Sequence, residues 1–351
     1  MRKHRQSIDA ELIDWKDIKD LHEWKGLLVG NGASLAIWEG FKYESLYQKA
    51  LQDIAHPLSE EDQDVFRSMG ETCNFERVLY ALWTAKVVCE VLRQDTKIIQ
   101  QSYENIQSAL IEAVHAVHVS WSSELEDTLC KLNETLMSYQ SVYSTNYDLL
   151  LYWVVMSGDT PSHKDYFWSN GRNFDISNTQ ISDESRRILY LHGALQFITH
   201  PFRGQTSKLT ARRENLLSQF DTALLSGEIP LFISEGTAED KLSAIRRSDY
   251  LSFAYEQFAT HNNNLVIFGH SLEENDQHLI DAMKHWRNCN AIAISMRRHM
   301  SDSNRVIQRK ANIKVRIREK LPNTQILFFD AETHPFGDPT LRVTRNGDNN
   351  L

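Results

Sequence analysis

The sequence has few of the residues and segments that mark specialised classes of protein. Its 351 residues include only four cysteines, and no two of them form a CxxC pair. A structural zinc site needs about four such ligands brought together, so the sequence predicts no bound metal. No apolar run approaches the roughly 20 residues of a membrane helix, and no apolar stretch of signal-peptide type follows the basic first residues. We therefore expect a cytoplasmic protein without membrane contact.

Internal repeats, low-complexity tracts and Pro/Gly-rich linkers are missing as well. The 41% of hydrophobic and 24% of charged residues are values typical of globular domains. A formal net charge of −9 argues against a chain that binds nucleic acid over its whole surface. Residues 297–320 form one basic stretch with nine Lys or Arg. We interpret this stretch as solvated surface, and as the only segment through which a nucleic acid could bind.

Short apolar runs alternate with helical patterns along the chain. Such runs are typical of parallel strands covered on both faces. Their alternation with helices predicts an α/β protein with a Rossmann-like, doubly wound parallel sheet of about six or seven strands. The runs are residues 26–29, 142–145, 188–191, 229–233, 265–268, 291–294 and 326–329.

A long stretch without strand signal separates the first two runs. Apolar residues recur there at helical spacing, from Phe75 to Val114 and again from Leu125 to Leu136. We predict a single domain over residues 1–351, with a helical insertion over about residues 63–138 and a frayed tail over residues 346–351. Glu76 and Arg77 begin the first helical pattern. A solvated helix end is the simpler interpretation for them than a place in a ligand crevice.

The strongest local signal is the glycine loop that follows Val29. Glycines let a backbone approach a pyrophosphate closely, and a helix that begins there supplies N–H donors. The third glycine of the dehydrogenase fingerprint and a Walker lysine are both missing, so an ordinary strand-to-helix turn stays an alternative. The candidate cofactor-binding residues of this loop are Gly30, Asn31, Gly32, Ala33 and Ser34.

Polar motifs follow the second and third apolar runs. Thr145, Asn146 and Asp148 stand at the end of the second run, and His192 stands at the end of the third. An asparagine amide can orient a water or a ribose hydroxyl, and a histidine at a strand end suits general-base work near neutral pH. The alternatives are an Asx turn that caps the next helix and a histidine satisfied by the backbone.

A further motif, Gly269, His270 and Ser271, follows the apolar run 265–268. It repeats the succession of strand, glycine and small hydroxyl, and it could hold an adenine ribose or a phosphate. In doubly wound sheets, ligands bind beyond the carboxyl ends of the strands. The position of all these motifs at strand ends therefore indicates a ligand site.

The order of the motifs resembles the NAD-binding pattern of the sirtuins. The chain has a Gly-x-Gly-x-Ser loop, then Thr-Asn-Tyr-Asp, Leu-His-Gly and Gly-His-Ser, over roughly residues 27–330. The resemblance implies that the first loop binds the pyrophosphate side of NAD and that Asn146 serves the nicotinamide ribose. It also implies that Asp148 supports the nicotinamide side and that His192 is the base. Residues 269–271 match the Gly-Thr-Ser loop of the family, with His270 at the threonine.

Two features of protein-deacetylating sirtuins are missing here. These are the four-cysteine zinc module after His-Gly and the Gly-Ile-Pro-Asp-Phe-Arg stretch of the first loop. The pattern is similar instead to zinc-less bacterial sirtuin-like domains that carry large helical inserts and hydrolyse NAD in anti-phage defence. The resemblance implies an NAD glycohydrolase, the effector of an abortive-infection system, that releases nicotinamide and ADP-ribose without a metal.

Two other functions stay open at this point. An ADP-ribosyltransferase or deacylase would need a second, peptide-shaped groove near His192. A regulatory module would bind NAD or ADP-ribose without turnover. Because unrestrained NAD cleavage would poison the cell, we also expect control through a homo-oligomer or through a separate sensor protein.

Overall fold

The computed structural model describes residues 9–38, 46–52, 54–118, 123–158, 162–182, 184–201, 204–210, 215–233, 236–298 and 303–343. The tail that the sequence predicts to be frayed, residues 346–351, lies outside the described residues. No helix in the described ranges combines the length and the apolar character needed to cross a bilayer.

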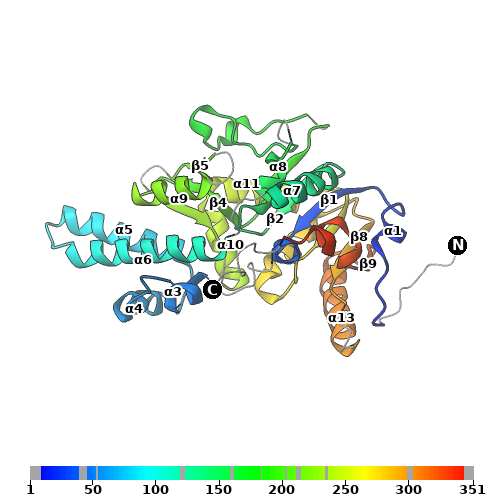
Figure 1. The fold of residues 1–351 in the computed structure, drawn as a ribbon, viewed down its shortest axis with the longest axis horizontal. Coiled ribbons are helices and arrows are strands. Elements are labelled where there is room, and N and C mark those ends of the chain that lie inside the picture. The colour runs from blue at the N-terminus through cyan, green and yellow to red at the C-terminus, as the bar shows by residue number, and fades with distance from the viewer. Residues whose placement is uncertain are drawn as a thin grey trace.

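A six-stranded parallel sheet forms the centre of the protein (Figure 1). Its strand order is β3-β2-β1-β7-β8-β9. The chain starts at a central strand, moves to one edge, returns to the centre and moves to the other edge, which is the topology of a doubly wound sheet. The predicted Rossmann-like fold is confirmed. The strands are β1 (Trp24–Val29), β2 (Ser141–Ser144), β3 (Arg187–Tyr190), β7 (Asn264–Phe268), β8 (Ala291–Met296) and β9 (Gln325–Asp330).

The strands are apolar on both faces because both faces are covered. Leu27 and Leu28, whose side chains point to opposite faces of β1, are both fully buried. One group of helices includes α7 (Ser123–Leu136) packed on α8 (Leu150–Met156). A second group consists of α10 to α13, which pack on one another. The right-handed crossovers of a doubly wound sheet place two such groups on opposite faces.

One predicted strand does not belong to the parallel sheet. The run 229–233 forms β6 (Ile229–Phe232), which pairs antiparallel with β4 (Gly193–Thr199) in a separate three-stranded sheet. The third strand there is β5 (Thr206–Lys208). An apolar run reveals that both faces of a strand are covered, but it does not reveal which neighbour the strand has. The assignment of this run to the parallel sheet was therefore wrong.

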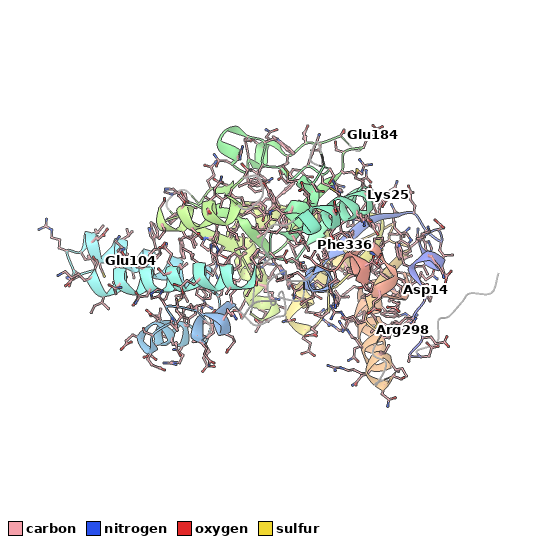
Figure 2. All side chains as sticks on the ribbon, viewed as in Figure 1. Asp14, Lys25, Glu104, Glu184, Arg298 and Phe336 are labelled. Atoms are coloured by element: carbon pink, nitrogen blue, oxygen red, sulfur yellow. The ribbon has the colours of Figure 1, made fainter. Side chains whose placement is uncertain are left out.

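The helical segment between β1 and β2 begins earlier than residue 63, with α3 and α4. Helices α5 and α6 pack on each other as a hairpin that projects from the body of the protein (Figure 1). Glu104 on α6 and Arg298, which follows β8, lie towards opposite ends of the molecule (Figure 2). The remaining helices are α1 (Trp15–Ile18), α2 (Asn31–Ile37), α3 (Leu46–Gln52), α4 (Glu60–Ser68), α5 (Phe75–Val91), α6 (Lys97–Val117), α9 (Asn215–Leu225), α10 (Ala238–Arg247), α11 (Asp249–Ala259), α12 (Gln277–Ala282) and α13 (Ser303–Lys320).

Candidate functional site

The direction of the sheet reverses between β1 and β7. From β1 the chain continues to β2 on one side, and from β7 it continues to β8 on the other side. The connections diverge there, so a crevice opens beyond the carboxyl ends of these two strands. The two glycine loops predicted from the sequence, residues 30–34 and 269–271, follow these two strands directly.

The glycines of the two loops allow the loops to touch each other. The Gly32 N–H donates to the Gly269 carbonyl at 2.7 Å. A Cβ at Gly32 would lie 2.7 Å from the Gly269 Cα, and one at Gly269 would lie 2.4 Å from the Ala33 nitrogen. Gly269 also has a φ of +69°, which side chains with a Cβ rarely adopt. The close backbone approach seen here is between the two loops, and the predicted approach to a pyrophosphate stays a prediction.

A cavity of about 670 Å³ opens above this crevice, and we call it the first cavity. Most of the residues predicted from the four motifs come together in its wall. Its lining includes Asn31, Gly32, Thr145, Asn146, His192, Gly269, His270 and Ser271.

The other predicted residues lie behind that wall. Ser34 donates to Asp148 Oδ2 at 2.7 Å and accepts from Asn146 Nδ2 at 3.0 Å. Because the Ser34 proton is committed to the carboxylate, the Asn146 amide must present its NH₂ group to Ser34. Gly30 and Ala33 provide the backbone of the loop. Asp148 therefore orients Asn146 through Ser34, and its support of the nicotinamide side stays a prediction.

His192 lies in the turn between β3 and β4, at the edge of the first cavity. Its carbonyl accepts from the Ile233 N–H at 2.7 Å, and its Nε2 lies 2.9 Å from Nε2 of His278. Gly193, the next residue, has a φ of +71° and packs against the Leu231 backbone. Burial lowers the pKa of His192 well below its usual range, and the neighbouring His278 acts in the same direction. The imidazole is therefore neutral at pH 7, and the lowered pKa makes it a weaker base than a free histidine.

A buried cluster lies beside His192, and His270 is its one other member that the sequence indicated. Lys241 Nζ lies 2.7 Å from Asp276 Oδ1, and His270 Nε2 lies 3.6 Å from Asp276 Oδ2. Burial alone would raise the pKa of Asp276, but His270, His192 and Lys241 outweigh it and lower the pKa to about 2. The signal available in the sequence was the pair Asp276 and His278, two residues apart after the Gly-His-Ser motif.

The cluster also contains a set of possible metal ligands. His192, Asp276 and His278 each offer a ligand atom, and these atoms lie within 4.8 Å of one another. Two histidines and a carboxylate are a donor set that zinc can use. Here Lys241 already neutralises the carboxylate, and the two imidazoles contact each other directly. The geometry fits a hydrogen-bonded relay better than a metal centre, and the absence of a metal stays a prediction.

Positive side chains line the other part of the first cavity. Three arginines contribute to its wall: Arg297 follows β8, Arg309 lies on α13, and Arg342 donates to the Ala36 carbonyl on α2. Arg297 and Arg309 belong to the basic stretch 297–320 that we interpreted as solvated surface. Others in that stretch are engaged within the protein: Lys310 with the Asp9 carbonyl and Arg316 with Gln277.

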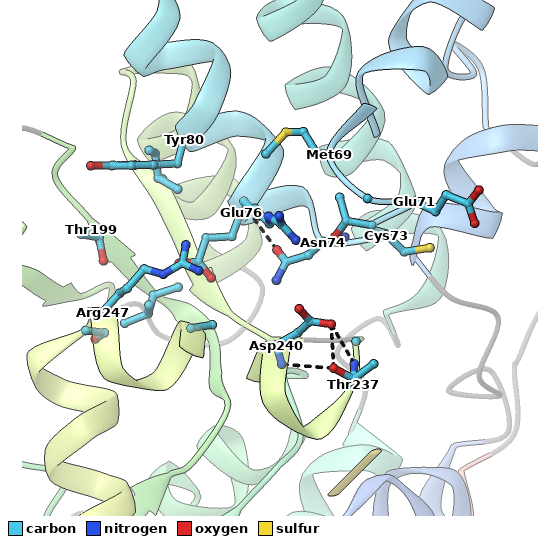
Figure 3. Close-up of a pocket in the computed structure, with 18 of the residues that line it drawn as sticks. Met69, Glu71, Cys73, Asn74, Glu76, Tyr80, Thr199, Thr237, Asp240 and Arg247 are labelled. Atoms are coloured by element: carbon cyan, nitrogen blue, oxygen red, sulfur yellow. Dashed lines mark hydrogen bonds between the residues drawn. The ribbon is translucent and has the colours of Figure 1, made fainter. Parts of the chain in front are cut away.

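Figure 3 shows a second cavity, of about 910 Å³, which adjoins the first. Gly236 and Asn275 line both cavities. Its other walls come from the start of α5, the β4–β6 sheet and α10. Glu76, which we interpreted as part of a solvated helix end, lies in this wall with its Oε2 inaccessible to solvent. For Glu76 that interpretation was wrong, because α5 packs on β6 and Glu76 is only partly exposed, whereas Arg77 is exposed as expected.

The chain matches one family model, described as Domain of unknown function (DUF4917), over residues 27–336. The match extends from β1 to beyond β9, so it includes both glycine loops, the helical segment and His192. None of the curated proteins compared with the chain matches it.

Proposed function

We propose that this chain, which belongs to the DUF4917 family, binds NAD in the first cavity and hydrolyses it to nicotinamide and ADP-ribose. The observation that carries the proposal is the placement of Asn146 and His192. They come from the ends of neighbouring strands, β2 and β3, and line one cavity together with both glycine loops. The proposal includes the sirtuin-like relationship and a role in bacterial anti-phage defence, both of which rest on the resemblance of the motifs.

The hydrogen bonding of the Asn146 side chain supports a ligand with hydroxyl groups. Its Nδ2 donates to Ser34, whereas its buried Oδ1 has no hydrogen-bond partner among the described residues. A buried acceptor without a partner costs about 1–3 kcal/mol, and native structures rarely leave one unpaired. A ribose hydroxyl or the attacking water would supply the missing hydrogen bond.

The proposed reaction needs a proton acceptor more than a nucleophile in the protein. The C1′–N bond to nicotinamide breaks, the ribose takes on oxocarbenium character, and the oxygen of a water forms the new bond to C1′. The water loses a proton, which neutral His192 can accept and share with His278 across 2.9 Å. The carboxylate of Asp276 acts to raise the pKa of His192 and so favours the protonated ring, while Lys241 acts in the opposite direction.

The arginines of the first cavity suit the diphosphate of NAD. A dinucleotide carries a diphosphate between its two nucleosides, and Arg side chains are the preferred partners of phosphate oxygens. Arg297 and Arg309 come from the segment between β8 and β9, at the opposite end of the sheet from β3 and His192, whereas Arg342 lies beside α2. The nicotinamide half would then lie near β2 and β3, and the adenosine half near β8 and β9.

Nicotinamide release from NAD by the purified protein tests the proposal. We expect Asn146→Ala and His192→Ala to reduce the rate at least ~100-fold, the usual size of a general-base or positioning effect. His163→Ala is the matched control, since His163 and His192 are both only 3% exposed and His163 lies outside the first cavity. It should lose stability without losing rate. Full activity of the His192 variant would refute the base role, and NAD binding without release would indicate a regulatory module.

We also propose that the protein is controlled through association, by the α5–α6 hairpin. Large apolar side chains are exposed near its tip, including Val91 and Ile98, which are 77% and 84% exposed. Contiguous exposed apolar surface is typical of a protein interface. A homo-oligomer that covers the tip is the partner we favour, and a separate sensor protein is the alternative.

Light scattering over a concentration series, paired with the nicotinamide assay, tests this second proposal. We expect Val91→Asp and Ile98→Asp to yield monomers from an oligomeric parent protein. Val315→Asp is the control, because Val315 is 69% exposed on α13, outside the hairpin. A parent protein that is monomeric at every concentration and fully active would contradict control by self-association.

A further inference from the structure

The proposed hydrolysis makes no use of the second cavity, although this cavity is the larger of the two. Its volume of about 910 Å³ lies in the range of sites for cofactors and other small ligands. It is built by three parts of the chain that are distant in sequence: the start of α5, the β4–β6 sheet and α10. We therefore ask which ligand a cavity of this size, next to the proposed NAD site, could bind.

Two polar atoms in its wall lack partners. Glu76 Oε2 and Thr199 Oγ1 are both inaccessible to solvent, and neither has a hydrogen-bond partner among the described residues. Both residues line the second cavity. Each unpaired buried group costs about 1–3 kcal/mol, so a molecule that bonds to both is favoured in this cavity.

Glu76 and Arg247 direct their side chains towards each other across this cavity (Figure 3). Burial raises the pKa of Glu76 to about 8, and the positive charge of Arg247 acts in the opposite direction. At pH 7 the carboxyl group is therefore mostly protonated, with one O–H donor and one carbonyl acceptor. The guanidinium group adds further donors. Together they match a flat ring whose edge has a donor next to acceptors.

The remaining walls also suit a flat heterocycle. Tyr80 lines the cavity and is 50% exposed, so its ring is available for stacking. Ile229 and Leu231 provide an apolar surface. Adenine combines an exocyclic N–H₂ donor with ring-nitrogen acceptors on the same edge.

We propose that the second cavity binds a nucleobase-containing ligand, held by its ring edge between Glu76 and Arg247 and by stacking on Tyr80. The site goes beyond the proposed NAD hydrolysis and does not depend on it. The adjoining position, through Gly236 and Asn275, makes this ligand a neighbour of whatever occupies the first cavity.

Calorimetric titration with adenosine 5′-monophosphate tests the assignment by comparing variants at the ring edge. We expect Glu76→Leu and Arg247→Met to weaken one class of sites at least ~10-fold, as the loss of a paired hydrogen bond predicts. Glu76→Gln keeps a donor and an acceptor, so its affinity should stay within ~3-fold of the parent protein. Binding that is unchanged in Glu76→Leu overturns the proposal, and a Gln variant as weak as the Leu variant overturns recognition by the neutral acid.

Photolabelling with 8-azidoadenosine 5′-monophosphate locates the site directly. We expect labelled peptides from residues 69–80 or 237–248, and we expect the label to persist in Asn146→Ala, which alters only the first cavity. Ethenoadenosine 5′-monophosphate, whose blocked edge lacks the N–H donor, should not compete. Labels confined to the first cavity would overturn this proposal and leave NAD binding intact. If the protein does not cleave NAD but is labelled at residues 69–80, the proposed hydrolysis fails and the nucleobase site stands.

If Glu76→Leu does not fold, the calorimetric comparison can be made with Arg247→Met alone, because Arg247 lies on the exposed part of α10.

Discussion

The two cavities are built in different ways. Polar residues of the first cavity directly follow four neighbouring strands of one parallel sheet, in the order β3, β2, β1, β7. The polar residues of the second cavity come from three separate elements. Glu76 lies in the first turn of α5, Thr199 at the end of the antiparallel strand β4, and Arg247 at the end of α10, more than 150 residues after Glu76. A regular sheet collects strand ends at one edge. No comparable rule brings the residues of the second cavity together.

The difference extends to how much change each cavity tolerates. In the first cavity, backbone contacts backbone, so its geometry and its fold depend on the same atoms. The second cavity is lined by side chains and by glycines such as Gly70, around which there is open space. We therefore expect substitutions of loop glycines in the first cavity to cost more stability than a substitution of Gly70 in the second.

The largest effect is expected from Gly269→Ala. The new methyl group would lie 2.4 Å from the Ala33 nitrogen, and the residue has a positive φ. Backbone strain and overpacking together should lower the free energy of unfolding by about 5 kcal/mol. Gly70→Ala is the matched control in the second cavity: its φ is +87° but nothing lies within 4 Å of the added Cβ, so only about 1 kcal/mol should be lost. If denaturant titrations show that Gly269→Ala and Gly70→Ala lose the same free energy of unfolding, the two cavities do not differ in this way.

A loss of about 3 kcal/mol is expected from Lys241→Met, which leaves the buried carboxylate of Asp276 without its cation. In the parent protein the pKa of Asp276 is about 2, below its ordinary 3.8. Its stabilising contribution is therefore present above pH 3.8 and is lost as the pH falls towards 2. The variant should approach the parent protein in stability at low pH, and Lys241→Met combined with Asp276→Asn should recover part of the loss at pH 7. If Lys241→Met alone is as stable as the parent protein at pH 7, the ion pair of Lys241 and Asp276 does not stabilise the fold.

The smallest effect is a gain in stability, from Glu76→Gln. The folded-state pKa of Glu76, about 8, is above its ordinary 4.5, so its contribution is fully present below pH 4.5 and is lost as the pH rises through 8. Glutamine does not ionise. The variant should equal the parent protein near pH 4 and exceed it by about 1–3 kcal/mol at pH 9, after allowance for partial exposure. Chemical unfolding at the two pH values measures the difference, and a variant that is less stable at pH 9 would contradict the burial of this carboxyl group.

The sequence allowed prediction of the fold and of most of the first cavity, for a physical reason. Apolar runs with small or polar residues at their ends reveal strands of a covered sheet, and the sheet itself determines that those ends meet. Asn146 and His192 could be placed in one site without knowledge of any long-range contact. Their partners Lys241 and His278 could not, because they lie on helices whose rotation about the sheet has no local signature.

The same reasoning explains the errors. The run 229–233 is as apolar as a central strand, yet it pairs with β4, because a run of this kind reports burial and not pairing partner. Glu76 was interpreted as solvated because a charged residue in the first turn of a helix usually is. The start of α5 packs on β6, more than 150 residues further along the chain. The second cavity could therefore be recognised only in the structure and not in the sequence.

Gly236 and Asn275 form a common wall between the two cavities. If a ligand of one cavity displaces either residue, it alters the other cavity as well, and occupancy of the two cavities is then thermodynamically linked. Linkage is reciprocal: if the nucleobase ligand changes the affinity for NAD by some factor, NAD must change the affinity for the nucleobase ligand by the same factor. Such a protein could respond to the ratio of two nucleotides rather than to the concentration of one, with no sensor domain between the sites.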